Sequence, residues 1–115
     1  MVIDTLKTLE VIEAMENFIS RKRPLEEIRN KVDLSYRIEN QSIIIFEIRP
    51  AYNNPDKKLE LDVAKTTFVK AKNHWKIFWM RADLKWHPYS PNEIVKSVNE
   101  FCELVEKDEH GCFWG

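Results

Sequence analysis

The chain has 115 residues, of which 43% are hydrophobic and 32% are charged, which is the size and composition of a single soluble domain covering residues 1–115. Its net charge of −1 gives no overall attraction to nucleic acid or to an anionic membrane, and its two glycines are too few for a glycine-rich phosphate loop. No apolar run is long enough to span a bilayer, the N-terminus lacks a signal-peptide pattern, and two cysteines make no disulfide framework, so we expect a cytoplasmic protein.

The N-terminal segment predicts an amphipathic helix. Its apolar residues recur at helical spacing, at Leu6, Leu9, Ile12, Met15, Phe18 and Ile19. Asp4 is the expected N-cap, and the basic run Arg21-Lys22-Arg23 complements the helix dipole at the other end. Pro24 ends this helix and can open a short second helix from Leu25 to Arg29.

From Lys31 onward the hydrophobic period changes to two, which predicts a β-hairpin. The apolar positions of its first strand are Val32, Leu34, Tyr36 and Ile38. The chain then turns at Asn40-Gln41-Ser42 and returns as a second strand from Ile43 to Arg49.

The register of this hairpin depends on the length of its loop. A two-residue loop sets Leu34 opposite Glu47, whereas a three-residue loop pairs Leu34 with Ile48. Because a slip by one residue moves every side chain to the other face, the apolar pattern favours the three-residue loop. That register also places Asp33 across from Arg49 and Ser35 across from Glu47.

A second hairpin is expected after a long loop over Pro50–Lys58. Its strands cover about Val63 to Ala71 and Trp75 to Ala82, joined by a turn at Lys72-Asn73. One face carries Phe68, Trp75, Ile77 and Trp79 and the other carries Val69, Phe78 and Met80. Since both faces are partly apolar, we expect both to be covered, by helices or by a second subunit.

The last predicted element is a helix that begins at Ser90-Pro91-Asn92-Glu93, a run that combines an N-cap serine, a first-turn proline and a capping-box glutamate. Its buried stripe is Ile94, Val98, Phe101, Cys102 and Val105. Gly111 ends the helix, and the aromatic tail Cys112-Phe113-Trp114-Gly115 is expected to dock on the domain. The predicted fold is therefore α+β: an N-terminal helix with a short second helix, a four-stranded antiparallel meander and a C-terminal helix.

Several strings resemble a known family. They are Lys31-Val32-Asp33-Leu34-Ser35-Tyr36-Arg37-Ile38-Glu39-Asn40, Phe46-Glu47-Ile48-Arg49-Pro50, Trp75-Lys76-Ile77-Phe78-Trp79-Met80-Arg81-Ala82-Asp83-Leu84-Lys85-Trp86-His87 and Gly111-Cys112-Phe113-Trp114-Gly115. The chain is similar, from about Asn17 to its end, to short bacterial proteins grouped as domain-of-unknown-function family 3024. The resemblance implies one compact bacterial domain and carries no activity and no catalytic residues.

The main candidate site is a basic and aromatic rim at the end of the fourth predicted strand. It consists of Arg49, Arg81, Lys85, Trp86 and His87. Arginine binds carboxylate or phosphate through two bonds, and tryptophan can stack on a base or another ring. The alternative is structural, with Arg49 paired to Asp33, Arg81 paired to Asp83 or Glu47, and Trp86 closing the core.

An acidic site at Asp33 and Glu47 is the enzymatic alternative. Nucleases of the restriction-enzyme type place two carboxylates on adjacent strands to hold Mg²⁺ near a lysine, and Asp33 with Glu47-Ile48-Arg49 has roughly that layout. Arginine in place of lysine cannot accept a proton at accessible pH.

Metal binding by the cysteines and histidines lacks the spacing of zinc sites, so no metal and no cofactor is predicted. A nucleophilic pair of Cys112 with His87 is also weak, because Asp108 and Glu109 would raise the thiol pKa.

The charge distribution also suggests self-association. Arg21-Lys22-Arg23 forms a basic end, and the segment Glu93–Glu109 is acidic, so a two-fold homodimer could set one end against the other. Three hypotheses stay open: a binding module for an anionic or aromatic ligand such as phosphate or nucleic acid, an Mg²⁺-dependent nuclease, and a structural subunit with no ligand. The sequence does not decide whether the protein is an enzyme.

Overall fold

A computed structural model of the chain describes residues 5–114 and confirms an α+β fold. The elements in chain order are α1 (Thr5–Lys22), the 3₁₀ helix η1 (Glu26–Ile28), β1 (Asp33–Glu39), β2 (Ser42–Ala51), β3 (Asn54–Val69), the 3₁₀ helix η2 (Lys70–Lys72), β4 (His74–Met80), β5 (Trp86–Pro88), β6 (Ile94–Val95) and α2 (Val98–Lys107). The strands form one antiparallel sheet in the order β1-β2-β3-β4-β5. The sequence predicts four strands and the described residues contain six, because the short β5 and β6 both pair with β4.

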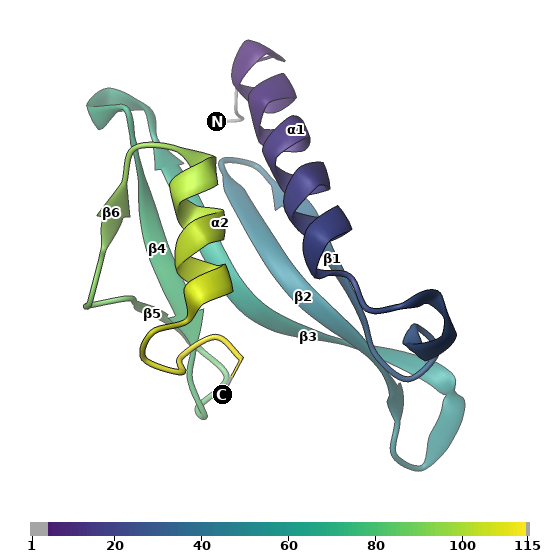
Figure 1. The fold of residues 1–115 in the computed structure, drawn as a ribbon. Coiled ribbons are helices and arrows are strands. Elements are labelled where there is room, and N and C mark those ends of the chain that lie inside the picture. Colours follow the sequence, from purple (N-terminus) through teal and green to yellow (C-terminus); the bar gives the residue numbers. More distant parts are fainter. Residues whose placement is uncertain (1–4, 115) are drawn as a thin grey trace.

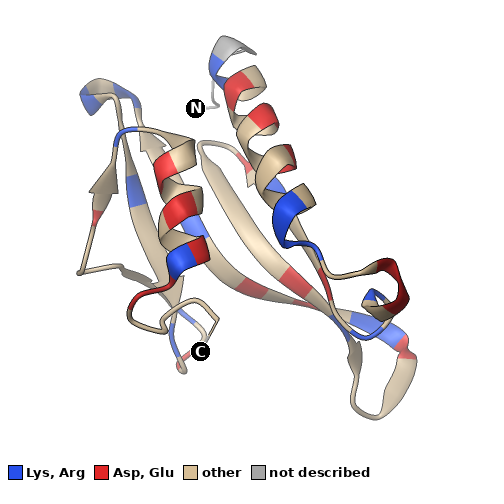
Figure 2. Cartoon of the chain, viewed as in Figure 1, with Lys and Arg blue, Asp and Glu red and all other residues tan. Residues whose placement is uncertain are grey.

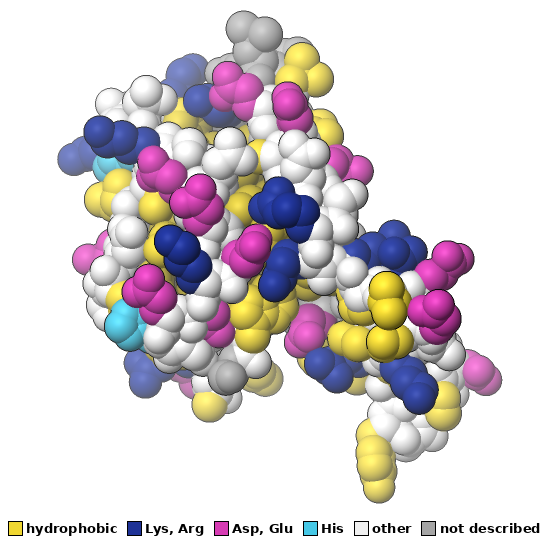
Figure 3. All heavy atoms as spheres, viewed as in Figure 1, with side chains coloured by type: hydrophobic (Ala, Val, Ile, Leu, Met, Phe, Trp, Pro, Cys, Tyr) yellow, Lys and Arg dark blue, Asp and Glu magenta, His cyan; other side chains and the backbone are white. Residues whose placement is uncertain are grey.

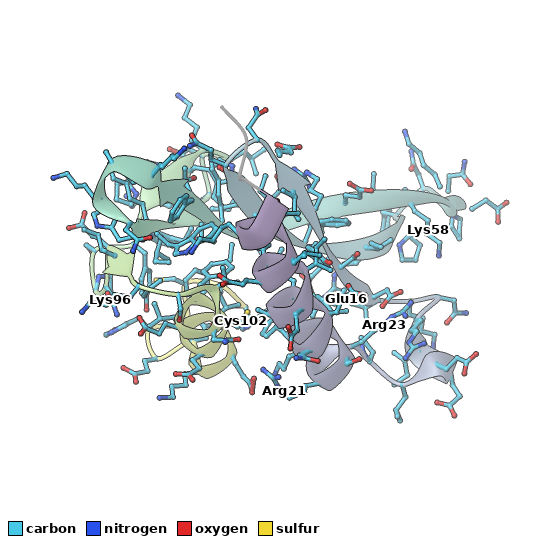
Figure 4. The ribbon with its side chains drawn as sticks, turned by 90° about the horizontal axis from the view of Figure 1, so that it is seen from above. Glu16, Arg21, Arg23, Lys58, Lys96 and Cys102 are labelled. Atoms are coloured by element: carbon cyan, nitrogen blue, oxygen red, sulfur yellow. The ribbon has the colours of Figure 1, made fainter. Side chains whose placement is uncertain are left out.

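Both helices lie on the same face of the sheet, as Figure 1 and Figure 4 show from two directions. We call this the covered face and the opposite one the open face. Side chains of α1 and α2 meet the sheet in a core whose members include Phe18, Ile43, Trp75 and Phe101, each at most 1% exposed. The sequence predicts cover on both faces. Within residues 5–114, helices cover only one.

The turn between β1 and β2 differs from the predicted one. Asn40-Gln41 alone joins the strands, so that Leu34 lies opposite Glu47. Asn40 takes a left-handed conformation with a φ of 53°, which asparagine tolerates better than most residues. The predicted three-residue loop is therefore wrong, and so is the predicted pairing of Asp33 with Arg49.

The composition of β2 explains why the register could not be predicted. Ile43, Ile44, Ile45 and Phe46 are consecutive and all buried. Over these four positions a slip by one residue exchanges one apolar side chain for another, so they do not select a register. The predicted register rested on Glu47, which the structure places on the covered face, opposite the buried Leu34. As a result Ser35 lies opposite Phe46, and not opposite Glu47 as predicted.

The β2–β3 hairpin is longer than the sequence predicts. Instead of a loop over Pro50–Lys58, β2 continues into this segment and β3 already begins at Asn54. β3 pairs with β4 only over Ala64–Val69, so the rest of the hairpin projects from the sheet (Figure 1). We call residues 49–62 the arm. The molecule is correspondingly elongated, with dimensions of 45 × 29 × 26 Å.

Helix α1 forms where predicted, but with a different buried stripe. Val11, Met15 and Phe18 are fully buried, whereas Leu9 and Ile12 are 60% and 39% exposed. At about 3.6 residues per turn, Leu9 lies nearly opposite Val11 on the helix, so both cannot face the core. The predicted N-cap Asp4 and the side chain of Leu6 lie outside the described residues. The predicted second helix is reduced to the single turn η1.

Helix α2 begins later than predicted, at a second capping box. The Ser97 hydroxyl accepts a hydrogen bond from the Glu100 backbone N–H at 3.2 Å, and the Glu100 carboxylate accepts one from the Lys96 N–H at 3.0 Å. The predicted N-cap, Ser90, lies in a turn instead, because the intervening Ile94–Val95 pairs with β4 as β6.

The buried stripe of α2 and the docked tail are confirmed in large part. Val98, Phe101, Cys102 and Val105 are buried, whereas Ile94 is 47% exposed and belongs to β6. Phe113 is 7% exposed, and the Trp114 indole N–H donates to the Val105 carbonyl at 2.8 Å. The helix ends at Lys107 with Asp108 in a left-handed conformation, before Gly111.

Candidate functional site

The open face can be mapped from the strand register, because residues directly opposite each other on adjacent strands point to the same face. One row crosses all five strands of the main path and consists of Arg37, Ile44, Lys65, Phe78 and Pro88. On one side of this row lie Ser35 and Phe46, and Met80 and Trp86. On the other lie Thr67, Lys76 and Ile94. The open face therefore combines three aromatic rings with basic side chains.

Basic side chains lie over these aromatic rings. The Arg37 guanidinium lies 5.3 Å from the centre of the Phe46 ring, and the Lys65 ammonium lies 5.4 Å from the Phe78 ring and 5.7 Å from the Trp86 ring. Phe46 is only 7% exposed although no helix covers it. Long basic side chains bury apolar surface beneath their methylene stems while the charge stays near water.

The cations of the open face differ in how they are neutralised. Arg37 donates two hydrogen bonds to the Asp62 carboxylate, at 2.9 and 3.1 Å, and one to Glu39 at 2.8 Å. These carboxylates raise the pKa of Arg37. Neither Lys65 nor Lys76 forms an ion pair with any carboxylate in residues 5–114. Lys65 is half-buried beside two rings, and no carboxylate among residues 5–114 compensates its charge.

A hollow of about 200 Å³ adjoins this cluster at the β4 edge. It is lined by Lys76, Ile77, Phe78, Pro88, Glu93 and Ile94. The hollow lies where β5 and β6 both pair with β4 and residues 89–93 connect these two short strands. The Ile77 N–H donates to the Glu93 carbonyl at 2.9 Å, and the Ile77 carbonyl accepts from the Tyr89 N–H at 2.9 Å.

One known protein family matches this chain. The family model described as "Domain of unknown function (DUF3024)" matches residues 3–115. The chain belongs to the DUF3024 family. No curated protein and no solved structure matches it. In the described part of this DUF3024 chain, no helix is long and apolar enough to cross a membrane.

The five predicted rim residues of this DUF3024 chain do not form one cluster. Trp86 lies on the open face, whereas His87 lies opposite Trp79 on the covered side, and Lys85 is exposed in the β4–β5 turn. Arg81 stacks on Trp79 at 5.4 Å. Arg49 lies in the arm and donates to Glu47 at 3.1 Å.

Three of the rim residues, His87, Arg81 and Lys85, differ in whether they have an ion-pair partner. His87 Nε2 is 2.8 Å from the Asp83 carboxylate, and this contact holds the pKa of Asp83 below its ordinary value. Arg81 and Lys85 form no side-chain ion pair within residues 5–114. Their role in ligand binding stays a prediction.

The alternative acidic site has little freedom to bind a metal ion. Both Asp33 carboxylate oxygens accept hydrogen bonds from Arg23, at 2.8 and 2.7 Å, and this pairing holds the pKa of Asp33 below its ordinary value of 3.8. Glu47 pairs with Arg49. Asp33 and Glu47 share a cavity of about 210 Å³ with Lys22, but the described residues contain no group of three metal-ligating side chains.

The cysteines do not form a reactive centre in this DUF3024 chain. Cys102 is buried with its Sγ 3.7 Å from the Met15 sulfur, and burial raises the pKa of its thiol to about 12. Burial also raises the pKa of Cys112, and its thiol contacts the His110 carbonyl rather than an imidazole. Neither thiol is activated for nucleophilic attack.

The basic and aromatic residues in contact on the open face are Arg37, Phe46, Lys65, Phe78 and Trp86. Of these, only Trp86 was among the residues predicted from the sequence. Lys65 and Phe78 lie on different strands, and only the β3–β4 register places them opposite each other. The alternation of β4 was a usable signal, since it already separates Phe78 from Trp79. Arg37 and Phe46 could not be joined to them because the β1–β2 register was not determined by the pattern.

Proposed function

We propose that the protein is a binding module whose open face holds a ligand combining a flat ring with a phosphate, and that the ligand is single-stranded nucleic acid. The observation that carries this proposal is Lys65. Its ammonium lies over two aromatic rings without a carboxylate partner in the described residues. A phosphate would compensate this charge, and a base could stack on the rings that the ammonium now covers.

The neighbouring groups support the same ligand. Lys76 lies on the same face, exposed and without an ion pair among residues 5–114, and so offers a second phosphate contact. The hollow beside Phe78 is lined by apolar residues together with Lys76 and Glu93, which suits the edge of a base. By contrast, the Arg37 charge is already satisfied by Asp62, so Arg37 contributes its stem and not its charge.

Charge limits the expected affinity. The chain has a net charge of −1, so only local charges attract an anionic strand. If Lys65 and Lys76 each contact one phosphate, the logarithm of the binding constant should fall with the logarithm of the salt concentration with a slope of about −1.4. A steeper slope would point to a broader basic surface than this face provides.

Fluorescence anisotropy with a labelled oligothymidylate of about ten nucleotides tests the proposal. Lys65→Met should reduce the magnitude of the salt slope by about 0.7, and Trp86→Ala should weaken binding about tenfold through lost stacking. Lys107→Met, on the exposed side of α2, is the matched control and should bind like wild type. Circular dichroism of each variant confirms that it is folded.

Parallel probes distinguish related ligands. Binding of a labelled oligoribonucleotide in preference to the DNA would name RNA as the ligand, and equal competition by a free mononucleotide would reduce the site to a nucleotide pocket. Absence of saturable binding to any of these probes, or a Lys65→Met variant that binds like wild type, would contradict the proposal. Mg²⁺-dependent shortening of the oligonucleotide that is lost in Glu47→Gln would favour the nuclease alternative instead.

A cytoplasmic location and a homodimer belong to the same proposal. Two free cysteines, one of them buried, are suited to a reducing compartment. The dimer does not need the basic and acidic ends to meet between subunits. Arg21 of α1 already pairs with Glu106 of α2 at 3.6 Å within one chain. Figure 2 shows basic residues at the end of α1 and several acidic residues along α2. A different surface is better suited to self-association.

A further inference from the structure

The β3 half of the arm has a free backbone edge. β3 pairs with β2 from Asn54 to Thr67, with a register shift that leaves residues 55–57 without a partner in β2. It pairs with β4 only over Ala64–Val69, and β5 and β6 both pair with β4. The edge of β3 from Asn54 to Asp62 therefore has no strand partner among the described residues. Figure 1 shows the β4–β5 turn and the arm diverging, and in Figure 3 the arm stands off from the body of the molecule.

This free edge carries exposed apolar side chains between charged ones. Leu59 is 39% exposed and Leu61 is 45% exposed. Both project on the covered side, because Leu61 lies opposite Glu47, which in turn lies opposite Leu34. Lys58 and Glu60 alternate with them and project on the open side.

Symmetry restricts how two copies of this edge could pair. A two-fold axis perpendicular to the sheet runs the two β3 strands antiparallel and keeps each face on its own side. Residues opposite each other must then belong to the same face, so each possible axis passes through a single residue of the strand.

The charged residues of β3 favour one of these axes over the others. An axis at Lys58 sets that lysine against itself and Asp56 against Glu60, and an axis at Glu60 sets that glutamate against itself. An axis at Leu59 instead places Leu59 against Leu59 and pairs Lys58 with Glu60 of the other copy, twice. Opposite charges across a strand pair stabilise it, and like charges destabilise it. The one unfavourable contact of this register is Asp56 with Asp62, and Asp62 is already neutralised by Arg37.

The geometry points to a homodimer in which the two arms pair antiparallel through β3, with the two-fold axis at Leu59. Lysines and a proline on an exposed edge usually prevent such pairing. Here the glutamate two residues after Lys58 supplies each lysine with a partner in the second copy. In the single chain Lys58 donates only to the Asn30 carbonyl, at 2.9 Å, and Glu60 is 4.0 Å from Arg37, so both remain available. Figure 4 shows Lys58 towards the end of the arm, away from the helices.

Such a dimer has a geometric consequence that does not depend on ligand binding. Because the axis is perpendicular to the sheet, both open faces would lie on the same side of one continuous sheet. Assays of self-association contain no nucleic acid, so failure of the dimer and failure of ligand binding are separate results.

Charge reversal tests the pairing. By sedimentation velocity over a concentration series, wild type should dimerise, and Lys58→Glu and Glu60→Lys should each weaken dimerisation by about tenfold or more, because each places like charges opposite each other twice. The double variant K58E/E60K restores the opposite pairs and should recover dimerisation. A wild type that is monomeric throughout, or a double variant no better than the single ones, would overturn the inference. Lys72→Glu, on η2, is the control and should leave the dimer unchanged.

Disulfide trapping tests the position of the axis. In a Cys112→Ser background, Leu59→Cys should form a covalent dimer on mild oxidation, since residues directly opposite each other in an antiparallel pair lie within disulfide range. Glu60→Cys should not crosslink, because in this register it lies opposite residue 58. Efficient crosslinking by Glu60→Cys but not by Leu59→Cys would place the axis one residue further along and contradict the proposed register. Circular dichroism before oxidation confirms that each variant is folded.

Discussion

Trp75 and Ile77 on the covered face of the sheet are each 1% exposed beneath the apolar side chains of α1 and α2. Ile44 and Phe46 on the open face are nearly as well buried, at 3% and 7% exposed. Both helices lie on the other face of the sheet (Figure 4). Their cover consists of neighbouring side chains on the same sheet, among them the stem of Arg37.

The two covers respond differently to a ligand. The helices cannot leave the covered face without unfolding the domain, because their own apolar stripes would be exposed with it. A lysine stem on the open face can change rotamer at the cost of a few weak contacts. The covered face therefore stabilises the fold, whereas the side chains that cover the open face could move aside for the ligand that we propose.

Truncating one tryptophan on each face tests most directly whether the two faces contribute differently to stability. Trp75→Ala should lower the free energy of unfolding by about 3 to 5 kcal/mol, since it leaves a cavity under the helices. Trp86→Ala removes a half-buried ring that borders solvent and should cost about 1 to 2 kcal/mol. Urea unfolding followed by circular dichroism measures both. Equal losses would mean that the open face is as structural as the covered one.

A smaller effect concerns the partly buried ion-pair network of Arg37 on the open face. Asp62→Asn should lower the free energy of unfolding by about 1 to 2 kcal/mol, because it replaces two charge-assisted bonds to Arg37, whose side chain is 32% exposed. Glu39→Gln is the matched control. The Glu39 side chain is 56% exposed, and its loss should cost less than about 0.5 kcal/mol. Urea unfolding measures both variants. A larger loss of stability for Glu39→Gln than for Asp62→Asn would show that Glu39, and not Asp62, is the main partner of Arg37.

Much of the architecture was predictable, and the errors have common causes. Period-two and helical patterns identified α1, β1, β2, β4 and the buried stripe of α2. The arm was missed because Pro55 and Asp56 are typical of loops, whereas the arm is held by the pairing of Arg49 with Leu59 and of Pro50 with Lys58. The start of α2 was misplaced because Ser90 and Ser97 each begin a plausible capping box, and only the pairing of β6 with β4 decides between them.

The candidate site was less predictable than the fold. Neighbours along the chain, such as Trp86 and His87, were grouped together, although strand alternation sends them to opposite faces. Neighbours across strands, such as Lys65 and Phe78, were not grouped, because that contact exists only once the register is known. A composition-rich segment therefore marks a region of the molecule and does not by itself define a binding surface.

A pH titration tests an ion pair at the edge of the sheet, where Arg23, just after α1, donates two hydrogen bonds to Asp33 of β1. The pKa of Asp33 is lower in the folded protein than its ordinary value of 3.8, so this pair contributes its full stabilisation above that pH and loses it as the pH falls through the folded value. Asp33→Asn should therefore be less stable than wild type at pH 7, and the difference should vanish in strong acid. Thermal unfolding across this pH range measures it. A difference that persists undiminished in acid would assign the effect to packing and not to charge.

The smallest expected change in stability is the one on which the ligand proposal depends most. Lys65→Met keeps an apolar stem over Phe78 and Trp86 and removes only the charge, so the free energy of unfolding should change by less than about 0.5 kcal/mol. Lys65→Ala removes the stem as well and should cost about 1 kcal/mol by uncovering the rings. If Lys65→Met is instead the more destabilising of the two in urea, the ammonium is an internal part of the fold. It would then not be available to a phosphate, and the open face would differ from the covered face only in the kind of side chain that closes it.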